Sequence, residues 1–238
     1  MVAMDRKGAA AVPPALITLE GIDGCGKSTQ ARLLAAALER AGYDVLLLRE
    51  PGGTAISERI RSILLDTDSV GMGTTCELLL YEAARAQLVE EVIRPALAAG
   101  KVVVCDRFYD STTAYQAYAG GLDKDMVSRA NGIAVGACVP TRTLVFDIEP
   151  EVAAARRASR EADRMEAKGL EYQRRVAEGF RAIAKAESGR VRLVPAADDV
   201  SHVFVRAVGE LEAVGLRIPN EAAREVFTES VETAGAAG

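Results

Sequence analysis

The residues with the clearest chemical potential form a glycine-rich segment near the beginning of the chain. Their pattern, Gly-x-x-x-x-Gly-Lys-Ser, is that of a P-loop. Backbone N–H groups of such a loop converge on a phosphate, and the following helix adds the positive end of its dipole. We expect Lys27 to reach the terminal phosphates of a nucleoside triphosphate and the Ser28 hydroxyl to ligate Mg²⁺. The segment comprises Gly21, Ile22, Asp23, Gly24, Cys25, Gly26, Lys27, Ser28 and Thr29.

A coincidental glycine-rich turn is the alternative to a P-loop. The context argues against it, because an apolar strand pattern precedes the segment and a helical pattern follows it. Cys25 inside the loop leaves two interpretations open. Either the loop N–H groups lower the pKa of its thiol and make it oxidisable, or it is an inert small residue that fits the loop.

Charged residues follow two further predicted strands. Arg49-Glu50-Pro51 ends the second strand, and Asp106-Arg107 ends the third. Because the carboxyl ends of parallel strands meet at one edge of a sheet, we expect these residues near the P-loop. A guanidinium at each place would hold a second anion, whereas the alternative is a surface ion pair. Asp106 would be a Walker-B-type acid that touches Mg²⁺ or its waters, the alternative being a helix cap.

A long helical pattern carries Tyr81 and Arg85 in the middle of an apolar face. A flat heterocycle would stack on Tyr81 while Arg85 donates to a carbonyl on its edge. A core tyrosine beside a snorkelling arginine explains the same spacing, and the sequence leaves both open. The helix after the third strand contains Gln116, whose amide can donate and accept as a pyrimidine imide requires. Ordinary helix-capping chemistry is the alternative there.

An arginine-rich segment follows the fourth predicted strand. Arg156, Arg160 and Arg164 recur every four residues, and like charges at that spacing destabilise a helix by about 0.2–0.5 kcal/mol per pair. Arg160 is the most crowded of them, with only Asp163 to offset it locally. We expect a mobile lid whose arginines close on a transferred phosphoryl group. The alternative is a solvated helix face relieved by the acidic residues within the segment.

Five apolar runs separated by helical patterns predict an α/β fold with an open, parallel, five-stranded sheet flanked by helices. The expected strands are Ala15–Leu19, Asp44–Leu48, Lys101–Cys105, Thr143–Ile148 and Val191–Val194. The expected helices are Lys27–Ala41, Ile56–Leu65, Thr75–Ala99, Ser111–Tyr118, Asp123–Val135, Glu151–Ser159, Gly169–Ala186 and Val200–Val214.

Composition narrows the function classes. The 238 residues suit one α/β domain, and the net charge of −5 disfavours a general nucleic-acid binder. No apolar run approaches the about eighteen residues of a membrane span. Four scattered cysteines and a lone histidine, His202, make a zinc site implausible and predict reduced thiols in the cytoplasm. We expect a disordered leader over residues 1–14, a P-loop domain over 15–214 and a partly disordered extension over 215–238.

The assembled motifs resemble those of bacterial thymidylate kinases, in order and spacing, from about Leu16 to Val214. The matches are the P-loop, Arg-Glu-Pro-Gly-Gly-Thr, the Tyr81 to Arg85 pair, Asp-Arg-Phe and Ser-Thr-Thr-Ala-Tyr-Gln. The resemblance implies a three-layer nucleoside-monophosphate-kinase fold, strand order 2-3-1-4-5, with a lid at about 154–168. It also implies a homodimer that uses Mg²⁺ and transfers the ATP γ-phosphoryl group to dTMP, giving dTDP and ADP. A kinase for another nucleotide or a nucleoside, and a P-loop binding protein, are the alternatives.

The same resemblance implies roles for individual residues. Tyr81 would stack on the thymine, and Tyr115 would crowd the 2′ position of the sugar. Asp23 would lie near the 3′-hydroxyl or the metal, which Ser28 and Asp106 would hold. The acceptor dTMP would contact Arg49, Glu50, Pro51, Arg61, Tyr81, Arg85, Arg107, Ser111, Thr112, Tyr115 and Gln116. ATP would contact the loop 21–29 with Arg156 and Arg164. Because the loop lacks an arginine, the catalytic set would be Asp23, Lys27, Arg107 and the lid residue Arg160.

Overall fold

The computed structural model describes residues 13–69, 71–157 and 163–236. Its centre is a five-stranded, fully parallel sheet in the order β2-β3-β1-β4-β5, which confirms the predicted topology. The strands are β1 (Ala15–Glu20), β2 (Val45–Arg49), β3 (Val102–Asp106), β4 (Arg142–Asp147) and β5 (Val191–Pro195).

The register of the sheet brings the predicted chemical residues together. Asp106 at the end of β3 pairs with Arg49 of β2 on one side and with Leu19 of β1 on the other. The chain segments that leave these three strands therefore meet at one edge of the sheet. Strand β1 is buried along its whole length, as a central strand covered on both faces requires.

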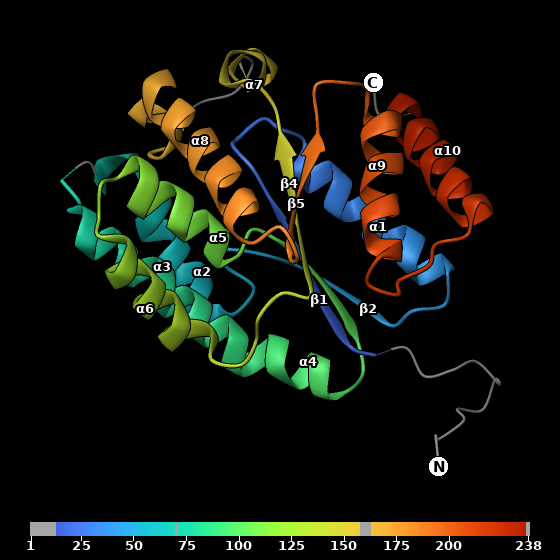
Figure 1. The fold of residues 1–238 in the computed structure, drawn as a ribbon, viewed down its shortest axis with the longest axis horizontal. Coiled ribbons are helices and arrows are strands. Elements are labelled where there is room, and N and C mark those ends of the chain that lie inside the picture. Colours follow the sequence, from blue (N-terminus) through green and yellow to red (C-terminus); the bar gives the residue numbers. More distant parts are fainter. Residues whose placement is uncertain (1–12, 70, 158–162, 237–238) are drawn as a thin grey trace.

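Helices cover both faces of the sheet (Figure 1). Helices α1, α9 and α10 lie on one side, whereas α2, α3, α4 and α6 lie on the other. The helices are α1 (Lys27–Arg40), α2 (Ala55–Leu65), α3 (Thr74–Leu88), α4 (Arg94–Ala98), α5 (Tyr109–Thr112), α6 (Lys124–Val135), α7 (Pro150–Arg157), α8 (Leu170–Ala186), α9 (Val200–Glu212) and α10 (Asn220–Ala236). Short 3-10 turns occupy η1 (Thr67–Ser69) and η4 (Glu166–Lys168).

Two of the expected helices contain wider turns than a sequence period of 3.6 predicts. The helix expected over Thr75–Ala99 is divided into α3, the π-helical turn η2 (Val89–Ile93) and α4. Pro95 explains this turn, because it has no N–H to donate to the preceding helix and its ring crowds the carbonyl four residues earlier. The helix expected over Ser111–Tyr118 is α5 followed by the π-helix η3 (Thr113–Ala119).

Helix α10 belongs to the segment after Pro219 and packs against α1, the helix that begins at the P-loop. Its Ala222 and Val226 side chains are buried in the main hydrophobic core. An ion pair at 3.2 Å joins Arg40 of α1 to Glu225 of α10. Among the described helices, none is long and apolar enough to cross a membrane.

Candidate active site

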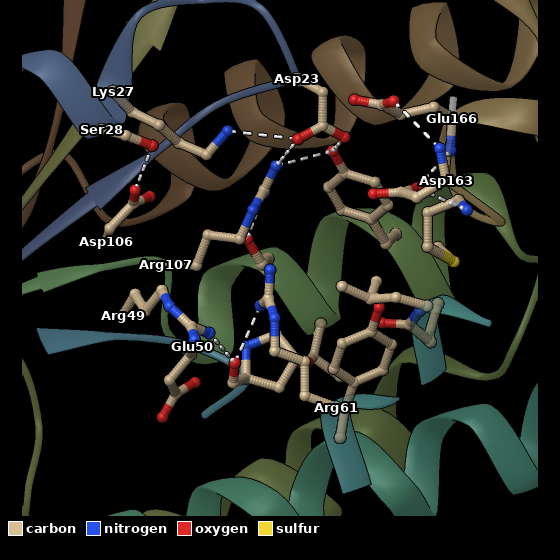
Figure 2. Close-up of a pocket in the computed structure, with 18 residues that line it drawn as sticks. Asp23, Lys27, Ser28, Arg49, Glu50, Arg61, Asp106, Arg107, Asp163 and Glu166 are labelled. Carbon is tan, nitrogen blue, oxygen red and sulfur yellow. Dashed lines mark hydrogen bonds and ion pairs between the residues drawn. The ribbon is translucent and has the colours of Figure 1, made fainter. Parts of the chain in front are cut away.

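A cavity of about 240 Å³ opens at the carboxyl edge of β1, β2 and β3. Its walls come from the P-loop, the ends of β2 and β3, helices α2 and α3, the π-helix η3 and the segment before η4 (Figure 2). The lining residues are Asp23, Lys27, Ser28, Arg49, Glu50, Pro51, Arg61, Leu65, Tyr81, Asp106, Arg107, Ser111, Thr112, Tyr115, Gln116, Asp163, Met165 and Glu166.

The predicted P-loop, residues 21–29, connects β1 to the first turn of α1. Gly26 caps this helix in the left-handed region, with φ of 93°, a conformation that glycine adopts without strain. At Gly24 an added Cβ would stand 2.3 Å from the Ala153 carbonyl oxygen of α7, so only glycine allows this close approach. Lys27 is buried, and its Nζ lies 3.4 Å from both the Ile22 carbonyl oxygen and Asp23 Oδ1.

The residues predicted to hold Mg²⁺ are in direct contact. The Ser28 hydroxyl donates to Asp106 Oδ2, while the buried Asp106 Oδ1 accepts no hydrogen bond from the described residues. Mg²⁺ takes oxygen ligands and commonly uses one or two from the protein, completing its shell with water and phosphate oxygens. A hydroxyl and an unsatisfied carboxylate oxygen fit that requirement. No cluster of three His, Cys, Asp or Glu side chains suited to a metal occurs in the described parts of the chain.

Arg107 lies at the junction of the phosphate loop and the end of β3. Its backbone has φ of 73°, which a non-glycine residue rarely adopts and which is typical of functional sites. Its Nη2 donates to Asp23 Oδ1 at 2.5 Å and to the Tyr115 hydroxyl at 3.3 Å. Its Nη1 donates to the Gly21 carbonyl at 3.1 Å and to Ser111 Oγ at 3.0 Å. These four bonds fix the guanidinium over the P-loop.

Asp23 is held between two cations. Its carboxylate faces Arg107 on one side and Lys27 on the other (Figure 2). Burial alone would raise the pKa of Asp23, but the charges of Arg107 and Lys27 outweigh burial and hold that pKa well below its usual range. Asp23 therefore stays ionised and orients both cations.

Glu20 supports Arg107 from behind the cavity. This fully buried carboxyl at the end of β1 accepts the Phe108 N–H at 2.7 Å and the Ser111 N–H at 3.2 Å. Burial and the neighbouring Asp110 carboxylate raise the pKa of Glu20 to about 8. By holding the backbone on the far side of Arg107, Glu20 stabilises the left-handed conformation. Sequence reasoning missed it, because an acid at the end of an otherwise apolar strand carries no pattern of its own.

A second positive region lies across the cavity, at the end of β2 and on α2. Nη1 atoms of Arg49 and Arg61 both donate to the Pro51 carbonyl, at 3.0 and 2.9 Å. Arg49 also pairs with Glu58 at 3.0 Å. Burial and the adjacent charge of Arg49 lower the pKa of Arg61, which means that a bound anion would relieve local repulsion. Both arginines line the cavity with Glu50 and Pro51, and their predicted contacts with dTMP stay predictions.

Tyr81 and Arg85 of α3 have different surroundings. Tyr81 lines the cavity, whereas Arg85 is only 2% exposed and is not one of the lining residues. Its guanidinium pairs with Glu50 at 2.8 Å and with Glu82 at 2.6 Å, and donates to Thr112 Oγ1 at 3.0 Å. The alternative of a snorkelling arginine is wrong, since two carboxylates compensate the buried charge. No described residue accepts a hydrogen bond from Nη2.

The π-helix η3 contributes two consecutive side chains, Tyr115 and Gln116, to the same cavity. Its wide turn places neighbouring residues closer to one face than an α-helix would. Tyr115 is buried, and its ring lies 5.2 Å from the Arg107 guanidinium carbon. With Ser111 and Thr112 of α5, these residues line the same cavity as Arg49.

The fold and this arrangement agree with comparisons to known proteins. The family model described as thymidylate kinase matches residues 19–206.

The chain belongs to the thymidylate kinase family.

Individual members support this placement. A thymidylate kinase of Symbiobacterium thermophilum is 50% identical, over 79% of this chain and 87% of that protein. One of Chlorobium luteolum is 49% identical, over 82% of this chain and 96% of its own length. The crystal structure of thymidylate kinase from Ehrlichia chaffeensis superposes with a TM-score of 0.70 at 33% identity, covering 84% of this chain and 98% of that one. The expected nucleoside-monophosphate-kinase fold and enzyme class are confirmed.

The lid arginines have several environments in this member of the thymidylate kinase family. Arg156 donates to the Ala196 and Ala197 carbonyls, at 3.1 and 3.0 Å. Arg164 is buried, with Nη1 2.6 Å from Glu77. Neither lines the cavity, and their predicted contacts with ATP stay predictions. Arg160, the predicted catalytic arginine, lies outside the described residues.

Four lining residues were not predicted from the sequence: Leu65 of α2 and, before or in η4, Asp163, Met165 and Glu166. Asp163 is expected from the sequence only to relieve charge within the arginine-rich segment, and Glu166 carries no expectation. Asp163 lies near the end of that segment and Met165 and Glu166 directly follow it, so the useful signal was that the chain returns to the cavity at this point.

Cys25 is buried, and the pKa of its thiol is raised, chiefly by burial. The hypothesis of an activated, oxidisable thiol is therefore wrong, because burial outweighs the nearby positive charge of Lys27. Its Sγ would stand 2.8 Å from a Cβ added at Gly21, so the loop fits a small residue at position 25.

Proposed function

We propose that the chain catalyses in-line transfer of the ATP γ-phosphoryl group to dTMP, with Mg²⁺, giving dTDP and ADP. One observation carries the proposal. Lys27 of the donor loop and Arg107 beside the acceptor wall contact the same carboxylate, Asp23, within one cavity. Two phosphates bound to these cations would be neighbours. Phosphoryl transfer needs mainly such positioning and charge neutralisation.

On the donor side, the P-loop N–H groups and Lys27 would bind the ATP phosphates, and the lid residues Arg156 and Arg164 would add contacts to ATP. Ser28 and Asp106 would hold Mg²⁺. Bound there, the ion would neutralise charge that develops on the phosphoryl oxygens. Arg160 would supply the further cation, since the P-loop carries no arginine.

On the acceptor side, Arg49, Arg61 and Arg107 would bind the dTMP phosphate. Tyr81 would stack on the thymine, and Tyr115 would exclude a 2′-hydroxyl. Gln116 would meet the base edge. Arg85 would support this wall through Glu50 and Thr112, with its remaining Nη2 group available to the base.

A homodimer in the cytoplasm is the assembly that we propose. Helix α3 packs against both α2 and α6, and the three helices expose Ile56, Ile63, Leu79 and Ile133. Ile133 is 86% exposed, and apolar side chains on helices that pack side by side favour a protein–protein contact over this surface. The four cysteines are free thiols, which suits a reducing compartment. Light scattering would measure the oligomeric state directly.

A coupled assay of ADP release tests the activity. Purified protein with ATP and Mg²⁺ is supplied in turn with dTMP, dUMP, dCMP, AMP and thymidine. We expect dTMP to give the highest kcat/KM and thymidine, which lacks the phosphate that the arginines bind, to give no turnover. Equal turnover of thymidine, or ADP release that does not depend on an acceptor, would contradict the proposal.

A further inference from the structure

Three hydrogen-bond donors converge on one buried acid, Glu77, just outside the cavity. Glu77 lies on α3 and is 1% exposed. Gln116 Nε2 donates to its Oε1 at 2.8 Å, and Arg164 Nη1 donates to its Oε2 at 2.6 Å. Lys168 Nζ lies 3.0 Å from both oxygens. The acid thus joins the π-helix of the acceptor wall to the last part of the predicted lid, residues 163–168.

The ionisation of Glu77 decides which end of the Gln116 amide it can meet. Burial alone would raise the pKa of Glu77, but hydrogen bonds from Gln116, Lys168 and Arg164 and the charge of Lys168 outweigh burial and lower that pKa. An ionised carboxylate only accepts hydrogen bonds. The NH₂ group of Gln116 must therefore face Glu77, and the reverse orientation would place two acceptors against each other.

The other end of the amide is thereby fixed as well. Gln116 lines the cavity, and no described residue donates a hydrogen bond to its Oε1. The amide consequently offers the cavity an acceptor. A pyrimidine whose ring nitrogen N3 carries a proton, as in thymine and uracil, can donate to that oxygen. In cytosine the same nitrogen carries a lone pair instead of a proton, and this lone pair would repel the Gln116 Oε1 atom.

We propose that Glu77 is a specificity-determining residue, which selects bases with an N3–H by locking the orientation of the Gln116 amide. This inference rests on the proposed function, because it requires the base to meet Gln116. A purely structural brace between α3 and the last part of the predicted lid is the competing explanation. The two explanations differ in one respect: a brace would affect all acceptors alike, whereas an orientation lock discriminates between bases.

The variant Glu77→Gln separates them. A glutamine at position 77 offers both an oxygen and an NH₂ group, so Gln116 can turn and present either end to the base. We measure kcat/KM for dTMP and the inhibition constant of dCMP against dTMP phosphorylation. The preference for dTMP over dCMP should fall by about tenfold or more. An amide fixed in one orientation discriminates between the bases, whereas an amide that can turn presents a matching group to either base.

Lys168→Met is the matched control. It removes a donor of Glu77 outside the cavity lining but leaves the ion pair with Arg164 and the hydrogen bond from Gln116, both of which favour the ionised carboxylate. Its preference for dTMP over dCMP should stay at the wild-type value. If Glu77→Gln does not fold, the double variant Glu77→Gln/Lys168→Met removes a cation together with the carboxylate and carries the same test.

The outcomes are distinguishable. If wild-type protein does not phosphorylate dTMP, the proposed function fails. If it does, and the Glu77 variant loses activity toward dTMP with an unchanged preference over dCMP, Glu77 is only a brace and the orientation lock is refuted. A loss of preference in the Glu77 variant but not in Lys168→Met supports the lock.

Discussion

Replacement of Arg107 by alanine is the most direct test of the two-phosphate arrangement. All four Nη hydrogens of Arg107 are donated to oxygen atoms of the protein. The Nε–H group and the positive charge therefore remain to bind the phosphate of dTMP. One charge-assisted hydrogen bond contributes about 1.5–3 kcal/mol, and the positive charge adds attraction. A loss of about 3–4 kcal/mol corresponds to about a 10²- to 10³-fold fall in kcat/KM for dTMP. The coupled ADP assay measures it.

Arg107→Gly is the matched control for the backbone. Both variants lack the guanidinium and should lose the same activity. Glycine adopts φ of 73° without strain, whereas alanine there is less stable by about 1 kcal/mol. Since about 1 kcal/mol shifts the melting temperature of a domain of this size by about 2–4 °C, Arg107→Gly should melt higher than Arg107→Ala. Calorimetry makes the comparison.

Two results would refute this reasoning. A folded Arg107→Ala variant whose kcat/KM for dTMP stays within tenfold of wild type would remove Arg107 from phosphate binding. Equal melting temperatures for the two variants would show that the left-handed conformation relaxes without difficulty. A further substitution, Asp23→Asn in the Arg107→Gly background, should restore stability but not activity, because it neutralises the carboxylate left without its arginine.

Two further predictions concern the carboxylates of β1 and β3. Asp106→Asn should raise the Mg²⁺ concentration needed for half-maximal activity by about tenfold or more, since an amide binds Mg²⁺ more weakly than a carboxylate; a metal titration with an unchanged midpoint would contradict the assignment. Glu20→Gln should change the pH dependence of stability. The pKa of Glu20 is about 8 in the folded protein against 4.5 ordinarily, so wild type loses stability as pH rises through that window, by up to about 5 kcal/mol. Glu20→Gln should lack this loss. Denaturant unfolding of wild type and variant at pH 5 and pH 8 measures it. If the free energy of unfolding changes equally in both proteins between these two pH values, the reasoning fails.

The fold could be predicted almost completely from the sequence, because buried parallel strands are continuous apolar runs and the linking helices have a clear period. Strand β1, for example, begins at its predicted residue and extends by one, to Glu20. The π-helical turns could not be predicted. At η2 the effect of Pro95 depends on how neighbouring carbonyls are satisfied, which the hydrophobic period does not record.

The site could be predicted where its residues carry a motif. Lys27, Ser28 and Asp106 lie together as expected. The missed residues act through partners that are distant in the chain: Glu20 accepts from Ser111, and Glu77 accepts from Gln116. Their chemistry appears only when the fold brings an acid from one element beside donors from another.

The π-helix η3 has a consequence for how the family can change in length. A π-helical turn contains one residue more than the α-helical turn that it replaces. Deleting a single residue from Thr113–Ala119 would therefore leave an α-helix in phase with its flanks, but neighbouring side chains within the former wide turn would lie further apart, about 100° around the axis. Tyr115 and Gln116 would then no longer share the cavity. Insertions and deletions in this helix should be tolerated far less than substitutions on its outer face.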